Sequence, residues 1–103
     1  MNIIGLGKAG CAIADGFAQY PEYNIYKIDV NISGERCLSI KKQQGPEDYE
    51  SKCPSLKTFF KNAKGDTIVV IGGSGDISAM CLRVMEHIRP ACNIAVLYIR
   101  PDI

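Results

Sequence analysis

The sequence feature that most limits the fold is the hexapeptide Gly5-Leu6-Gly7-Lys8-Ala9-Gly10, which lies between a short apolar run and a helical pattern. The apolar run, Asn2–Leu6, is typical of a buried strand. The spacing G-x-G-x-x-G between a strand and a helix is typical of a tight turn that lets the helix pack closely on a parallel sheet. The start of the chain therefore indicates an α/β fold.

Hydrophobic periodicity predicts that helices and strands alternate along the rest of the chain. In the first helix, Ile13, Phe17 and Tyr20 recur at the spacing of an apolar helix face. In chain order, the expected elements are a helix over Ala9–Tyr20, a strand over Asn24–Val30, a half-exposed edge strand over Cys37–Lys41, a helical stretch over Glu47–Ala63 that Pro54 interrupts and Gly65 ends, a strand over Thr67–Ile71, a helix with the apolar stripe Ile77, Met80, Cys81, Val84, Met85 and Ile88, and a last strand over Asn93–Ile99.

This order of elements requires right-handed crossovers and a mostly parallel sheet. We expect a Rossmann-like three-layer sandwich with about five strands in the order 3-2-1-4-5, so that the first strand is central. Residues 1–103 form one domain at this length, with little room for a separate substrate domain.

Composition narrows the classes of partner and compartment. The formal net charge is +1 and the charges are scattered, which argues against binding to nucleic acid or to a membrane surface. The five cysteines are an odd number and form no CxxC motif, so we expect neither disulfides nor a metal site. No leader or membrane-spanning run is seen, and reduced thiols favour a cytoplasmic location.

The first glycine turn is a candidate phosphate site. The N–H groups at the start of a helix and the helix dipole favour an anion there, and glycine lets the backbone approach it. Asp29 ends the second strand, where a carboxylate can accept hydrogen bonds from ribose hydroxyls. The predicted phosphate-binding residues of this turn are Gly7, Lys8, Ala9, Gly10 and Cys11.

A second glycine-rich turn follows the strand Thr67–Ile71. Backbone amides in such a turn can form an anion-binding concavity, and the predicted contacts are Gly72, Gly73, Ser74, Gly75 and Asp76. The hydroxyl of Ser74 or Ser78 could also donate to a phosphate oxygen. A carboxylate repels a phosphate unless it caps a helix or shares a Mg²⁺ ion, and capping is the role expected of Asp76. Both turns lie at carboxyl ends of strands that flank the point where the strand order reverses, so we expect them to form one site.

No catalytic apparatus is evident in the sequence, and we assign no catalytic residue. His87 is the one histidine, and it lies on the flank of the last helix's apolar stripe, far from both turns. No Ser/His/Asp or Cys/His arrangement and no pair of carboxylates accompanies the glycine turns.

Together, the two turns resemble the nucleotide-binding half of the tubulin/FtsZ superfamily. Gly7–Ala14 resembles the first phosphate loop of that family and the helix after it, and Gly72–Asp76 resembles the front of its GGGTGTG-type signature, with Ser74 at the threonine. The frame from Thr67 to Pro101 also follows the family's pattern. Asp76 and Ile77 depart from the signature, where the family prefers a small residue and then a glycine.

The resemblance implies binding of GTP or GDP, with Mg²⁺ as a companion ion. In that family GTP is hydrolysed between neighbouring subunits by an acidic loop, and the corresponding position lies beyond Ile103. The resemblance therefore implies a nucleotide-binding module with little hydrolysis of its own, or a fragment of a longer protein.

Two other interpretations remain open. The motif G-x-G-x-x-G together with Asp29 also fits a small Rossmann domain that binds NAD or FAD. Alternatively, the glycine turns are only architectural, and the chain is a non-catalytic interaction module. In that case the edge strand Cys37–Lys41 is available to pair with another chain, including a second copy.

Overall fold

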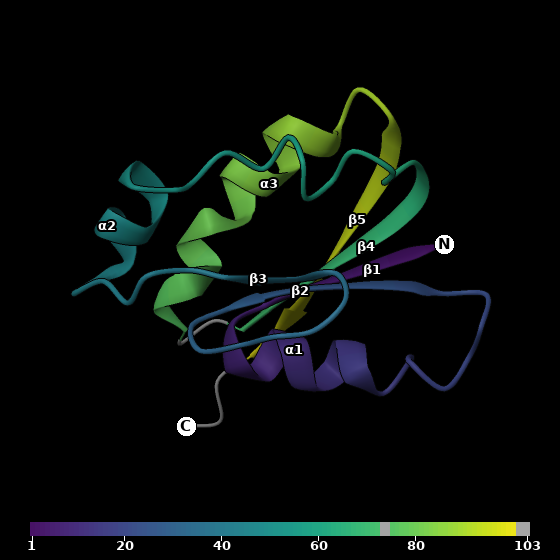
Figure 1. Ribbon diagram of the computed structural model, residues 1–103, viewed down its shortest axis with the longest axis horizontal. Helices are drawn as coiled ribbons and strands as arrows, with labels where there is room; N and C mark the ends of the chain where they lie inside the picture. The colour runs from purple at the N-terminus through teal and green to yellow at the C-terminus, as the bar shows by residue number, and fades with distance from the viewer. Residues whose placement is uncertain (73–74, 101–103) are drawn as a thin grey trace.

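The computed structural model describes residues 1–72 and 75–100, which fold around a five-stranded parallel sheet (Figure 1). The strand order is β3-β2-β1-β4-β5, as the sequence predicts. The strands are β1 (Asn2–Leu6), β2 (Asn24–Asp29), β3 (Cys37–Ser39), β4 (Gly65–Gly72) and β5 (Cys92–Ile99).

Helices cover both faces of this sheet. They are α1 (Gly7–Asp15), α2 (Pro46–Ser51), the 3₁₀ helix η1 (Asp76–Met80) and α3 (Cys81–Ile88). Figure 1 shows α1 on one face, and α2 and α3 on the other. The result is the predicted Rossmann-like three-layer arrangement. None of the described helices has the length and apolar character needed to cross a bilayer.

The central strand β1 is buried along its whole length, as a parallel strand covered on both faces must be. Successive side chains of a strand point to opposite faces, so β1 supplies both halves of the core. Ile4 and Leu6 pack in the larger half with η1 and α3, whereas Ile3 packs with Ala14 and Val70 in the smaller half beneath α1.

A buried asparagine fixes the amino ends of the three central strands. Asn2 Nδ2 donates to Lys64 O at 2.9 Å and to Thr67 Oγ1 at 3.1 Å, and Asn24 Nδ2 donates to Asn2 Oδ1 at 3.3 Å. A buried amide is costly unless its hydrogen bonds are made, and here they are made only when β1, β2 and β4 are in register. These hydrogen bonds of Asn2 thus lie at the opposite end of the sheet from the glycine turns.

The first helix differs from its prediction in length. It ends at Asp15 rather than Tyr20, and residues 16–19 form turns instead. The amides of Phe17 and Ala18 bond to carbonyls three residues back, Ala14 and Asp15, which is the tighter 3₁₀ pattern that often closes a helix. Phe17 then packs edge-on against Tyr23, with ring centroids 5.1 Å apart.

The buried face of α1 also differs from the apolar stripe expected in the sequence. Ile13 and Tyr20 are 41% and 46% exposed. The buried residues are small ones instead: Gly7, Gly10, Cys11 and Ala14. The reason is that α1 lies so close to β1 and β4 that only small side chains fit between them.

The largest other differences from the predicted elements lie between residues 37 and 65, whereas the bounds of β2, β4 and β5 differ by one or two residues. The helical stretch over Glu47–Ala63 is only α2 followed by irregular chain and turns, because Pro54 cannot continue a helix. Gly65 does not end a helix but begins β4, with a φ of +86°. The edge strand over Cys37–Lys41 is shortened to Cys37–Ser39, although it does lie outermost beside β2.

The stripe after the second glycine turn is confirmed by burial. Ile77, Met80, Cys81, Val84 and Ile88 are all buried, and Met85 is partly buried against the same core. The capping role expected of Asp76 is wrong: Asp76 is the first residue of η1, and the cap position belongs to Gly75. As an acidic residue in the first turn, Asp76 still interacts favourably with the helix dipole.

Candidate functional site

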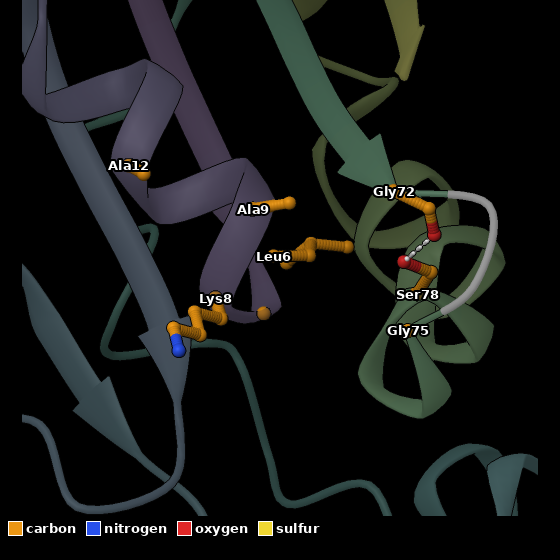
Figure 2. A pocket seen from close by; sticks show the side chains of 8 residues that line it. Leu6, Lys8, Ala9, Ala12, Gly72, Gly75 and Ser78 are labelled. Carbon is orange, nitrogen blue, oxygen red and sulfur yellow. Dashed lines mark hydrogen bonds between the residues drawn. The ribbon is translucent and has the colours of Figure 1, made fainter. Parts of the chain in front are cut away.

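A pocket of about 450 Å³ lies at the carboxyl ends of β1 and β4 (Figure 2). From β1 the chain runs outward to β2 and β3 on one side, and from β4 to β5 on the other, so the strand order reverses between β1 and β4. Ligands of open α/β sheets bind at such a point. The lining residues are Leu6, Gly7, Lys8, Ala9, Ala12, Gly72, Gly75 and Ser78.

The first wall of the pocket is the start of α1. Gly7 begins the helix with a φ of +75°, a backbone conformation that other residues rarely adopt. The N–H groups of Gly7, Lys8 and Ala9 have no acceptor inside the helix because they belong to its first turn. Lys8 is exposed, and Figure 2 shows its side chain pointing away from the Gly72–Ser78 turn.

Gly5 and Gly10 belong to the packing beneath this wall rather than to its surface. A Cβ atom at Gly10 would lie 2.5 Å from Val70 O, and one at Gly5 would lie 2.5 Å from Gly10 O. Both contacts are with backbone, which cannot rotate away. These glycines therefore set the close approach of α1 to β1 and β4.

The second wall is formed by Gly72, at the end of β4, and by Gly75 and Ser78, at the start of η1. Ser78 Oγ donates to Gly72 O at 2.7 Å, and the Gly75 N–H donates to the same carbonyl at 3.3 Å. A Cβ atom at Gly72 would lie 3.3 Å from Ala9 Cβ, so the two walls face each other closely. Figure 2 shows Ala9 pointing toward Gly72. The predicted contacts Gly73 and Ser74 lie outside the described residues.

The structure brings together five of the predicted phosphate contacts, namely Gly7, Lys8, Ala9, Gly72 and Gly75. Gly10 and Cys11 are buried in the second turn of α1, where amides have carbonyl partners within the helix. Asp76 is exposed and does not line the pocket.

The sequence interpretation missed two lining residues, Leu6 and Ala12, whereas Ser78, a candidate phosphate donor, does line the pocket. Leu6 is the last residue of β1, and its position between Gly5 and Gly7 was the signal for it. Ala12 lies one helical turn after Ala9, so the spacing of small residues on α1 could have indicated a shared open face.

Asp29 ends β2, as predicted, next to the start of α1. Its neighbour Ile28 pairs with Leu6, so the carboxyl end of β2 is level with the first wall. One carboxylate oxygen accepts the Val30 N–H at 2.8 Å, which holds the side chain in place. Asp29 is half-buried and does not line the pocket itself.

The Cys11 thiol ties α1 to the sheet. Cys11 Sγ lies 3.4 Å from Gly5 O and 3.6 Å from Ile28 O, so its proton is shared between carbonyls of β1 and β2. Burial, and secondarily the negative charge of Asp29, raises the pKa of Cys11 to about 11. The thiol is therefore a packing and hydrogen-bonding group, not a nucleophile.

This raised pKa predicts a loss of stability in alkaline solution. The unfolded thiol releases its proton near pH 9 while the folded one retains it to about pH 11, so the contribution is full below pH 9 and is lost as the pH rises through that window. Between pH 8 and 11, urea unfolding should show wild type losing about 2 kcal/mol more than Cys11→Ala. Equal losses in the two proteins would contradict the buried, protonated thiol.

Neither metal ligands nor histidine chemistry accompanies the pocket. Within residues 1–72 and 75–100, no group of three or more His, Cys, Asp or Glu side chains is arranged to hold a metal ion. His87 lies on α3, exposed, with its ring 6.2 Å from that of Phe60. It does not line the pocket, in agreement with its expected distance from the glycine turns.

No protein-family model matches the chain, and no curated protein or solved structure is significantly similar to it. Any functional assignment therefore depends on the geometry of the pocket and on the motif residues themselves.

Proposed function

We propose that this chain binds a nucleotide, GTP or GDP, with its phosphates in the pocket between α1 and the β4–η1 turn. The observation that carries the proposal is the juxtaposition of the two glycine turns across one pocket where the strand order reverses. The two turns, Gly7 and Gly72, are about 65 residues apart in sequence and meet at the point where open α/β sheets bind their ligands.

The polar groups of this pocket are those that suit an anion. The free amides of the first turn of α1 point outward along the positive end of the helix dipole. Gly7 and Gly72 carry no side chain to keep a phosphate from the backbone. Leu6, Ala9 and Ala12 supply an apolar lining beside these polar groups.

The choice of guanine as the base, and of Mg²⁺ as the companion ion, is based on the resemblance to the tubulin/FtsZ superfamily. Mg²⁺ is usually held by one or two carboxylates and by the phosphates themselves. Asp76, exposed in the first turn of η1, is a carboxylate beside the second wall that suits this role. Because we assign no catalytic residue, the proposal is for binding with little hydrolysis.

A second candidate, NAD or FAD binding, is favoured by one specific observation. Asp29 is the last residue of β2, the strand beside β1, and this is where dinucleotide-binding folds hold a ribose. Asp29 Oδ1 accepts the Val30 N–H. Among the described residues Oδ2 has no donor, so it can accept a hydrogen bond from a ribose hydroxyl.

A thermal-shift panel of GTP, GDP, ATP, NAD and FAD, with and without Mg²⁺, tests the proposal. A ligand at one hundred times its Kd adds about 2.7 kcal/mol to the free energy of unfolding, which raises Tm by roughly 10 °C or more in a domain of this size. We expect this rise with GTP or GDP, larger with Mg²⁺. A rise with NAD or FAD alone, abolished by Asp29→Asn, would replace the first candidate by the second. No rise with any ligand would contradict both and favour the interaction module.

A further inference from the structure

The outer edge of β5 is a second feature that this proposed site does not explain. β5 has eight residues, Cys92–Ile99, and none of them is charged. Within residues 1–72 and 75–100, β4 is the one strand that pairs with it, so its other row of N–H and C=O groups is open. Val96, Leu97 and Tyr98, in its carboxyl-terminal half, are 45%, 46% and 54% exposed.

The opposite edge of the sheet is built differently. β3 has only three residues, and charged side chains flank it at Glu35, Arg36, Lys41 and Lys42. Short edge strands with nearby charges are the usual protection against pairing with another chain. β5 is eight residues long, carries three exposed apolar side chains and has Arg100 as the one charged residue within two positions of its ends, so it is the edge on which pairing is expected.

The exposed apolar side chains of β5 lie on both faces of the sheet. Val96 and Tyr98 pair in register with Val69 and Ile71, whose side chains pack in the core beneath α3. Leu97 pairs with Val70, which packs on the α1 face. A helix could cover only one of these faces, whereas an added strand covers the rims of both and also satisfies the open backbone groups.

We propose that β5 pairs antiparallel with β5 of a second copy of this chain. A two-fold axis perpendicular to the sheet keeps the α3 faces on one side, so the two sheets join into one. With the axis at Leu97, this residue faces its own copy, and Val96 of each chain faces Tyr98 of the other. Antiparallel neighbours on one face interact directly, and β5 brings no like charges together.

A second copy fits this edge better than a charged partner does. The formal net charge of +1 gives little repulsion between copies, and an uncharged strand offers nothing for a charged segment to recognise. A single strand contributes less than the roughly 800 Å² per partner of a standard stable interface. We therefore expect a weak dimer, with a Kd in the range of about 10–100 µM.

Sedimentation velocity over about 5–500 µM protein tests this dimer. We expect the sedimentation coefficient to rise from a monomer to a dimer value across this range. Leu97→Lys and Leu97→Glu each place two like charges at the axis, and each should weaken the dimer at least about 30-fold. An equimolar mixture of the two variants should restore it, because opposite charges then meet. Leu82→Lys, a matched change at a 59% exposed leucine on α3, should leave it unchanged.

The outcomes separate clearly. Restoration in the mixture, together with slower hydrogen exchange of β5 amides at high concentration, supports the strand pairing. A monomer at every concentration overturns the proposal, and so does a dimer that Leu97→Lys leaves intact. Circular dichroism and Tm of each variant show whether it is folded, and Tyr98→Lys is the substitute if a Leu97 variant is not.

Discussion

Gly10→Ala is expected to unfold the domain or to lower its Tm by more than about 10 °C. The added Cβ atom would lie 2.5 Å from Val70 O, a separation that real Cβ atoms do not show. The obstacle is the backbone of a central strand, so the helix must move away from the sheet. Such overpacking costs about 1–3 kcal/mol and occasionally more, and here the Cys11 hydrogen bonds to the sheet are lost as well.

Gly45→Ala is the matched control for this change. Gly45 has extended backbone, with φ −169° and ψ 171°, and a Cβ atom there meets nothing within 4 Å. Its Tm should stay within a few degrees of wild type, measured by circular dichroism on both variants. If Gly10→Ala has the same Tm as Gly45→Ala, then α1 does not lie as close to β4 as described.

Ala9→Trp is expected to reduce nucleotide affinity at least about 100-fold while leaving the fold intact. Ala9 is exposed in the first turn of α1, so a larger side chain there displaces no core residue. Its Cβ faces Gly72 across the pocket, so an indole would occupy the space proposed for the phosphates. The measurement is isothermal titration with whichever nucleotide stabilises the wild type.

Ala18→Trp is the matched control, because it makes the same substitution outside the pocket. Ala18 is exposed in the turns that follow α1, and it does not line the pocket. The variant should bind as wild type does. Because the chain contains no tryptophan, each variant also gains a single fluorescent reporter. If Ala9→Trp binds with wild-type affinity, the ligand does not occupy this pocket.

The strand order could be predicted because each strand carries a local signal that tertiary packing reinforces. Thr67–Ile71 is continuous and β-branched, and such runs suit a strand covered on both faces. The glycine turn after β1 fixed the position of the first helix, and right-handed crossovers left one natural order for the rest. The juxtaposition of the two turns followed from that order alone.

The face of α1 could not be predicted in this way. Hydrophobic periodicity identifies the face with the largest apolar side chains. The distance between the helix and the sheet decides which side-chain sizes fit there. At the separation that Gly5 and Gly10 permit, Ala14 fits in the core and Ile13 does not. The glycines that marked the site also carried this packing information, but a hydrophobic pattern does not include it.

The predicted strand order already placed β5 at an edge of the sheet. The exposure of Val96, Leu97 and Tyr98 was not predicted, because the residues of β5 have the composition of a buried strand. Ser78 was a candidate phosphate donor in the sequence, but its hydroxyl donates to Gly72 O, a contact that no sequence pattern indicates.

The burial of β1 between two distant neighbours has a consequence for synthesis on the ribosome. Asn2 pairs with Asn24 on one side and with Thr67 on the other. At about 5–20 residues per second, the second neighbour emerges seconds after the first. Throughout that interval one edge of a strand that is buried in the fold is open, and parallel pairings of this range form slowly. The growing chain is therefore most vulnerable to aggregation, and most dependent on chaperones, before β4 is complete.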